Sequence, residues 1–236
     1  MVQLIKKPGL YQTVSEMAYH SDPVIKPSLS SGVAKILLEK TPRHAWMAHP
    51  RLNPNYVAET KAAFDLGSAA HTLMLQSGDG IEVIDAPDYR TKAAKEARDE
   101  AHANFKTPIL ADKYVEVQAM VAAGREQMAN LADPIDRIAF TPETGRAEQT
   151  MVWQEGDVWC RARLDWEPDA RVVFHDYKTT GQSAQPEAWA KTLYNFGGDV
   201  QAGFYRRGIR AVLGVEVPEW RYIVQEVKPP YALSVV

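Results

Sequence analysis

Apolar and polar residues alternate along three neighbouring segments in the second half of the chain. Residues 146–153, 158–166 and 171–179 each carry apolar side chains at every second position over part of their length, which is typical of half-buried β-strands. Short polar turns separate the segments, at Glu155–Asp157 and Glu167–Ala170. The pattern therefore predicts an antiparallel meander in which tight turns bring consecutive strands side by side.

Segments with the spacing of α-helices precede and follow this meander. Pro186 and the pair Gly197-Gly198 suit the first and last positions of one of them, because proline fits the first helical turn and glycine ends helices. Helices are expected over residues 32–40, 57–76, 89–105, 111–131, 187–196 and 199–213, and short strands over 81–84 and 219–227.

The length of the chain fits one large domain with an elaborated helical part. Residues 1–27 are rich in turn formers, and we expect them to form an irregular arm. Residues 28–236 are expected to be a single domain, with a helical part over 28–145 and the meander and following helices over 146–236.

Composition removes several classes of protein from consideration. The chain has 236 residues, 45% hydrophobic and 24% charged, with a formal net charge of −3, so any nucleic-acid surface must be a local basic patch. Cys160 is the single cysteine, which excludes a disulfide framework and any iron–sulfur or zinc site built from several thiolates. We see neither a signal peptide nor an apolar run of the ~18 residues needed to span a membrane, so a cytoplasmic protein is expected.

Charged residues interrupt the apolar pattern at the ends of two predicted strands. Asp165 lies near the end of the second strand, and Asp176 and Lys178 lie two residues apart near the end of the third. Residues two apart on a strand face the same side, so these groups would gather at one end of the sheet. A divalent metal ion would account for two carboxylates there, whereas the simpler alternative is a solvated strand end.

Further polar residues share faces of the predicted helices and strands. His71 follows Gly67 by one helical turn and would point into the close contact that this glycine permits, where the residues alone favour a hydrogen-bonded core histidine. Glu148 on the first strand would join the same surface in one possible register. The remaining candidates are Gln201 and Tyr205, which share a helix face, and four arginines that suit either phosphate contacts or structural ion pairs, Arg161, Arg163, Arg206 and Arg210.

The order of these residues resembles a known family. Gly67-x-x-x-His71, Asp165, Asp176-x-Lys178 and Gln201-x-x-x-Tyr205 follow one another as in the RecB-like branch of the PD-(D/E)xK nucleases, and most closely as in the RecE (exonuclease VIII) nuclease domains. The segments at Leu29 and Leu66 are also similar, so the resemblance covers roughly residues 28–236.

The resemblance implies a fold and a set of ligands. It implies an α/β (α+β) class with a restriction-endonuclease-like core, in which a central mixed β-sheet containing the antiparallel meander is flanked by helices, with a helical N-terminal elaboration. It also implies that His71, Asp165, Asp176 and the backbone carbonyl of Tyr177 bind Mg²⁺, or Mn²⁺, with no iron–sulfur cluster. Lys178 would stand beside the attacking water, and Gln201 and Tyr205 would position DNA or the groups behind the ligands.

The resemblance further implies a function in recombination. The expected activity is Mg²⁺-dependent 5′→3′ digestion of double-stranded DNA ends, leaving 3′ single-stranded tails for a RecT-like single-strand annealing protein. The relatives imply a ring-shaped homo-oligomer, a trimer or a tetramer, encoded by a phage or prophage and acting in the bacterial cytoplasm. Two alternatives remain open: a RecB-like nuclease acting on single strands or other DNA ends, and a catalytically degenerate DNA-binding or assembly protein.

Overall fold

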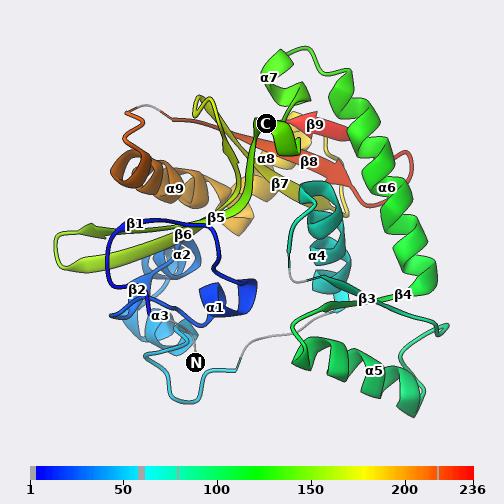
Figure 1. The fold of residues 1–236 in the computed structure, drawn as a ribbon, viewed down its shortest axis with the longest axis horizontal. Helices are drawn as coiled ribbons and strands as arrows, with labels where there is room; N and C mark the ends of the chain where they lie inside the picture. The colour runs from blue at the N-terminus through cyan, green and yellow to red at the C-terminus, as the bar shows by residue number, and fades with distance from the viewer. Residues whose placement is uncertain (1–3, 58–61, 79, 217) are drawn as a thin grey trace.

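The computed structural model describes residues 4–57, 62–78, 80–216 and 218–236. These residues form a mixed α/β fold in which helices cover sheets of both parallel and antiparallel strands (Figure 1), which confirms the predicted fold class. In the described part of the chain the strand orders are β1-β5-β6-β2, β7-β8-β9 and β3-β4.

The first of these sheets is built on a long hairpin. β5 (Gly145–Glu155) and β6 (Val158–Pro168) pair in antiparallel register around a turn in which Gly156 has a positive φ of 58°, a conformation that favours glycine. β1 (Gly9–Tyr11) adds to β5, and β2 (Ser28–Leu29) adds in parallel to β6. The predicted hairpin of the first two meander strands is therefore confirmed.

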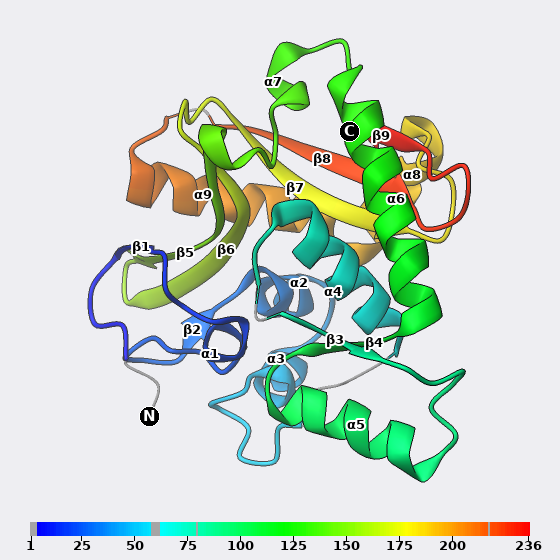
Figure 2. The ribbon, with the colours of Figure 1, turned by 45° about the vertical axis from the view of Figure 1, so that its right-hand side comes forward.

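The third strand of the predicted meander belongs to another sheet. β7 (Val173–Thr180) pairs in parallel with β8 (Glu219–Glu226), and β9 (Leu233–Val235) pairs antiparallel with β8. The prediction of a continuous antiparallel meander is wrong at this strand, because two helices connect β7 to β8 and such a crossover makes the strands parallel. The strands β6 and β7 still lie close together (Figure 2).

The crossover helices are α8 (Pro186–Phe196) and α9 (Gly198–Leu213), as predicted. Gly197 joins them in the left-handed conformation, with a φ of 78°. α9 packs against β5 and β6, and Gly208 permits this close approach because a Cβ there would lie 2.8 Å from the ring of Trp153. α9 thus supports the hairpin from one side.

The second sheet is covered on both faces. Tyr177 and Ile223 lie in one apolar cluster with residues of α6 (Ala111–Ala129), whereas Tyr222 and Val224 lie in another with Trp189 of α8. Figure 2 shows α6 crossing one face of this sheet. Because side chains alternate along a strand, successive residues of β8 face the two cores in turn.

Most of the remaining helices and strands lie in the part of the chain that was predicted to be helical, residues 28–145. α4 (Ala62–Leu75) packs against α6 and β7, and it confirms the helix expected at 57–76, whose residues 58–61 lie outside the described residues. The other elements are α2 (Ser31–Glu39), α3 (Pro42–Ala48), β3 (Ile81–Ile84), α5 (Lys92–Ala103), β4 (Thr107–Leu110), α7 (Pro134–Arg137) and the 3-10 helix η1 (Pro142–Thr144).

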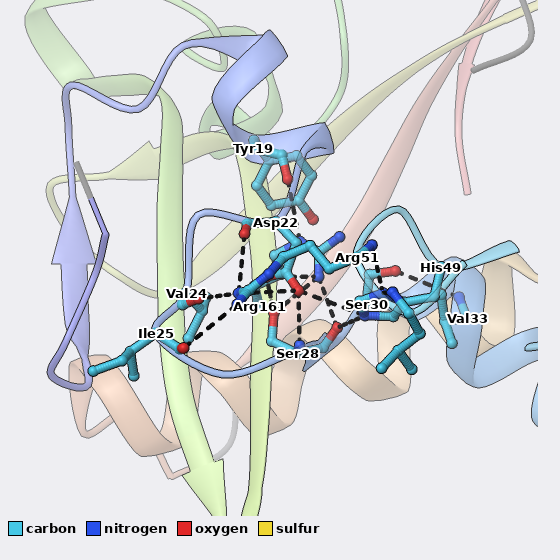
Figure 3. A network of polar contacts seen from close by, with 11 residues as sticks. Tyr19, Asp22, Val24, Ile25, Ser28, Ser30, Val33, His49, Arg51 and Arg161 are labelled. Carbon is cyan, nitrogen blue, oxygen red and sulfur yellow. Dashed lines mark hydrogen bonds and ion pairs between the residues drawn. The ribbon is translucent and has the colours of Figure 1, made fainter. Parts of the chain in front are cut away.

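The N-terminal arm has more structure than its composition predicts. Besides β1 it contains α1 (Glu16–His20), and a buried polar network fixes it to the hairpin (Figure 3). Asp22 accepts hydrogen bonds from the backbone N–H of Ser28 at 2.9 Å and from the Ser28 hydroxyl at 2.6 Å, and Arg161 of β6 lies 3.3 Å from the same carboxylate. The arm thus contains two short regular elements, and both this polar network and the apolar contacts of Ile5 and Val24 with the hairpin hold it in place.

Candidate active site

The last part of β6 and the middle of β7 bring the predicted acidic residues together. Asp165 on β6 accepts a hydrogen bond through Oδ2 from the backbone N–H of Tyr177 on β7, at 2.9 Å. This bond joins two strands that belong to different sheets, and it places Asp165 next to Asp176 and Lys178. The three predicted side chains therefore lie together, but Asp176 and Lys178 lie inside β7 and not at its end, and a side chain rather than a strand ladder joins them to β6.

His71 reaches this cluster from α4. Its Nε2 lies 3.2 Å from Oδ1 of Asp165. Gly67, one turn earlier, faces β7, and a Cβ built there would lie 3.5 Å from the hydroxyl of Thr179. The small residue therefore lets α4 pass close to β7, and the side chain of His71, one turn later, lies beside the carboxylate.

Asp176 is the most deeply buried charge of the site. Its side chain is 0% exposed, Oδ1 accepts a hydrogen bond from Nε2 of Gln201 at 2.8 Å, and Oδ2 forms an ion pair with Nζ of Lys178. The ammonium group of Lys178 also lies 5.8 Å from the ring centroid of Tyr222, within range of a cation–π contact. Gln201 on α9 thus positions the second carboxylate from the opposite side.

Glu148 completes the acidic side of the cluster. The pairs Ala147–Trp166 and Gln149–Leu164 on either side place Glu148 opposite Asp165 in the β5–β6 register. Its φ of 55° lies in the left-handed region, which costs a residue with a side chain about 1–3 kcal/mol. Such local strain is found where neighbouring groups hold a side chain in a functional position, and the register left open by the sequence is thereby defined.

The charges of the site shift one another. Burial and the charge of Asp165 raise the pKa of Asp176 to about 6, although Lys178 opposes this. Burial opposes the charged form of Asp165 as well, but His71, Lys178 and the Tyr177 N–H outweigh it and lower that pKa. The pKa values of His71 and Lys178 are raised by the neighbouring carboxylates despite burial. The two carboxylates therefore compete for the cations around them.

The donor set suits a hard divalent cation. Carboxylate oxygens with one imidazole are ligands that Mg²⁺ and Mn²⁺ accept, and a cation lets two close carboxylates remain ionised together. Within the described residues no three His, Cys, Asp or Glu side chains converge closely enough to hold a metal ion as they stand. Lys178 holds one oxygen of Asp176 through its ion pair, so the residues fit the cation by their chemistry once that pair opens.

The predicted arginines separate into different roles. Arg161 is 3% exposed and donates to the Ser28 carbonyl at 2.7 Å and the Tyr19 carbonyl at 3.2 Å, so it serves the N-terminal arm and not the site. Arg163 forms an ion pair with Glu148. Arg210 donates to the Glu216 carbonyl at 2.9 and 2.8 Å, about 13 Å along α9 from Gln201 at the helical rise.

Arg206 is exposed on α9, and at 100° per residue it points away from the face that carries Gln201. The helical geometry therefore separates both Arg206 and Arg210 from Asp176, and a phosphate contact for them would lie outside the cluster.

Two tyrosines connect the site to the rest of the fold. Tyr205 is buried and hydrogen-bonded to the Tyr19 side chain and to the backbone of Arg163. Burial is the main reason that the pKa of Tyr205 lies well above its ordinary value. The hydroxyl of Tyr177 donates to Oε1 of Gln225 at 2.6 Å, and Nε2 of Gln225 donates to the Met120 carbonyl at 2.6 Å.

Gln225 was missed by the sequence reasoning. It directly follows the apolar run Tyr222–Val224 of β8, and a buried polar residue next to that run is the available signal. A Cβ at Gly124 of α6 would lie 2.7 Å from its Nε2 and Oε1, so the glycine makes room for this contact.

Comparisons with known proteins give the family of the chain and a similar fold. A family model described as "PDDEXK-like domain of unknown function (DUF3799)" matches residues 34–232. The fold is similar to the crystal structure of a putative exonuclease from Eubacterium rectale, with a TM-score of 0.58 and 10% identity over 96% of this chain and 78% of that chain. At this identity the likeness concerns the fold alone, and it confirms the predicted restriction-endonuclease-like core.

The search of curated proteins found no match. In the described part of the chain, no helix combines the length and the apolar character that crossing a bilayer requires.

Proposed function

Because the chain belongs to the family of PDDEXK-like domains DUF3799, we propose that it is a Mg²⁺-dependent nuclease that digests double-stranded DNA from 5′ ends and leaves 3′ single-stranded tails. The observation that carries the proposal is the convergence of Asp165, Asp176 and Lys178 with His71 where β6 passes β7. The fold likeness to a putative exonuclease supports hydrolysis of a phosphodiester. The 5′→3′ direction and the duplex substrate rest on the resemblance to RecE-type nucleases.

Asp165, Asp176 and His71 would hold Mg²⁺ or Mn²⁺, with the backbone carbonyl of Tyr177 as a further ligand. When bound, such an ion neutralises the phosphate and lowers the pKa of a coordinated water. Gln201 keeps Oδ1 of Asp176 in place through its amide, and the Tyr177 N–H does the same for Oδ2 of Asp165. The ligands are thus oriented by groups from two further elements, as precise sites require.

Lys178 has a different task in this arrangement. Its ammonium group pairs with Asp176, and its side chain is 27% exposed, so it stands between the buried carboxylates and solvent. A cation bound at Asp176 would release the ammonium group. It can then donate hydrogen bonds to the attacking water or to the phosphate oxygens, where negative charge develops in the transition state.

The proposed biological setting follows from the same resemblance. The chain would act in a bacterial host cell, as a phage or prophage protein that supplies 3′ tails to a RecT-like annealing protein, and a ring-shaped trimer or tetramer would enclose the DNA. Light scattering measures the oligomeric state, and a pull-down with an annealing protein tests the partner.

Linear duplex DNA labelled at the 5′ or at the 3′ end tests the activity. We expect Mg²⁺-dependent release of 5′-terminal nucleotides, persistence of 3′ label in shortening strands, and no digestion of closed circles. Asp176→Ala is the matched inactive control. Digestion of single strands only would favour the alternative RecB-like activity, and binding of duplex ends without any Mg²⁺-dependent digestion would contradict the enzyme proposal and favour a degenerate DNA-binding protein.

A further inference from the structure

Glu148 lies between two cationic side chains at the edge of the proposed active site. Its Oε1 is 3.6 Å from Nδ1 of His71, and its Oε2 forms an ion pair with Nη2 of Arg163. The side chains of Glu148 and Arg163 are both 12% exposed. Because the guanidinium group is engaged with this carboxylate and largely shielded from solvent, Arg163 is poorly placed to clamp a phosphate.

The two ring nitrogens of His71 face different carboxylates. Nε2 lies 3.2 Å from Asp165 and Nδ1 lies 3.6 Å from Glu148. A histidine that binds a metal ion through one nitrogen commonly donates its other N–H to a carboxylate, which fixes both the tautomer and the orientation of the ring. Glu148 occupies the position of that carboxylate on the side of the ring away from Asp165.

The backbone of β5 is shaped around this contact. Glu148 adopts a positive φ of 55° between residues that keep their regular pairing with β6, and Nε2 of Gln149 donates to the Ala147 carbonyl at 2.6 Å across the distortion. A side chain at a strained position persists when its surroundings hold it there. Arg163, two residues before Asp165 on the facing strand, is the group that does so.

We propose that Glu148 and Arg163 are positioning residues that set the affinity of the site for its divalent cation. Arg163 holds the Glu148 carboxylate, and Oε1 of Glu148, 3.6 Å from Nδ1 of His71, would accept the Nδ1–H once the ring turns toward the ion. The Nε2 lone pair is then directed at the position that the ion shares with Asp165. This inference rests on the proposed function, because it assumes that His71 is a metal ligand, and it gives Arg163 a role behind the ligands.

Binding of Mn²⁺ to the full chain without DNA, followed by electron paramagnetic resonance, tests the inference independently of activity. Loss of a group behind a metal ligand typically weakens metal affinity about 10–100-fold, and we expect a loss in this range for Glu148→Ala. Glu148→Gln keeps an acceptor for Nδ1–H and should lose less. Arg163→Gln should also weaken binding, and Arg163→Lys should restore part of it, because an ammonium group can still pair with the carboxylate.

Arg207→Gln is the matched control. Arg207 also pairs with a glutamate of β5, Glu155, with Nε donating at 2.8 Å, but this pair lies near the far end of the hairpin. Its Mn²⁺ affinity should match the wild type. Thermal unfolding of each variant checks that the chain is folded, and Glu148→Gln keeps the inference testable if Glu148→Ala does not fold.

The outcomes separate the two proposals. A folded Glu148→Ala with wild-type Mn²⁺ affinity overturns the positioning role while leaving the nuclease proposal intact. An Arg163→Gln variant that loses DNA affinity but not Mn²⁺ affinity overturns it too, because that result identifies a phosphate clamp. Equal losses in Glu148→Gln, Glu148→Ala and Asp165→Ala would instead identify Glu148 as a direct ligand. A wild-type chain that binds no Mn²⁺ overturns the proposed function and this inference together.

Discussion

Two clusters of buried charge meet the same strand, β6, four residues apart, and they differ in how their charges are balanced. At Arg161, one carboxylate, Asp22, accepts from Ser28 through both of its oxygens and also faces the guanidinium group. At Asp165, a second carboxylate, Asp176, shares the same small volume, and its pKa is raised to about 6 by burial and by that neighbouring charge.

The difference separates a structural network from a reactive one. Around Asp22 each charge has partners supplied by neighbouring backbone or side chains, so the arm is held in one arrangement. Around Asp176 the carboxylates exceed what His71 and Lys178 can balance without shifting their own pKa values, so the cluster is poised to accept another cation. Burial alone does not distinguish the two; the balance of opposite charges does.

The largest effect on stability should come from breaking the structural cluster. Arg161→Met takes the nearer guanidinium group from the buried Asp22 carboxylate and leaves Arg51 at 3.9 Å. Removal of one partner of a buried pair costs about 3–5 kcal/mol in the free energy of unfolding. Denaturation in urea measures this loss. Arg207→Met, which breaks the more exposed pair with Glu155, is the control and should cost at most about 1 kcal/mol. Similar losses in both variants would contradict the distinction.

Breaking the reactive cluster should affect activity instead. Asp176→Asn keeps an acceptor for Gln201 but removes the charge, and we expect Mg²⁺-dependent DNA digestion to fall on the order of 10³-fold, or about 4 kcal/mol. The free energy of unfolding without metal should stay equal or rise, because a charge is no longer buried beside Asp165. Gel assays and urea denaturation measure the two quantities. Parallel loss of stability and activity would show that Asp176 is structural.

Divalent cations should stabilise the reactive cluster alone. A ligand that binds only the folded chain adds about 1.4 kcal/mol at a concentration ten times its dissociation constant. We expect Mg²⁺ or Mn²⁺ to raise the unfolding midpoint of the wild type and of Arg207→Met, and to leave Asp176→Asn unchanged. A rise of equal size in Asp176→Asn would place the ion elsewhere.

Acid should weaken the structural cluster through His49, an effect smaller than the preceding ones. Burial lowers the pKa of His49 below its ordinary value of 6.5, although the Ser28 carbonyl and Asp22 oppose this. Above pH 6.5 both folded and unfolded chains hold the neutral ring. As the pH falls below 6.5, the unfolded chain takes up the proton first, so stability is lost until the folded pKa is reached.

The measurement is thermal unfolding of the wild type and of His49→Gln between pH 8 and pH 5. The wild type should lose more stability on acidification than the variant. Identical pH slopes would show that His49 does not titrate with folding.

Much of this arrangement was accessible from the sequence because it depends on local signals. The β5–β6 hairpin follows from alternation and a glycine turn, and α4, α8 and α9 follow from helical spacing with proline and glycine at their ends. The Asp176–Lys178 pair follows from the two-residue period of a strand.

The remainder depends on tertiary contacts that no local pattern carries. Arg161, Arg163 and Asp165 share one face of β6. Arg161 nevertheless binds the N-terminal arm, whereas Arg163 binds Glu148. The turn after β6 suggests an antiparallel pairing of β7 with β6. In the structure β7 pairs with β8, and the crossover through α8 and α9 makes that pairing parallel. The left-handed backbone of Glu148 has no sequence signature at all, since glutamate rarely adopts it.

Gly124 gives the site a dependence on a residue in another layer of the protein. Gln225 packs against this glycine and accepts a hydrogen bond from the Tyr177 hydroxyl, while the backbone N–H of the same tyrosine donates to Asp165. A methyl group at position 124 would displace Gln225. The Tyr177 side chain would then lose its hydrogen-bond acceptor, and the position of Tyr177 beside the acidic cluster would change. The choice of residue on the face of α6 that covers the sheet therefore affects a site to which α6 contributes no side chain. A screen for variants with altered metal preference should include this helix.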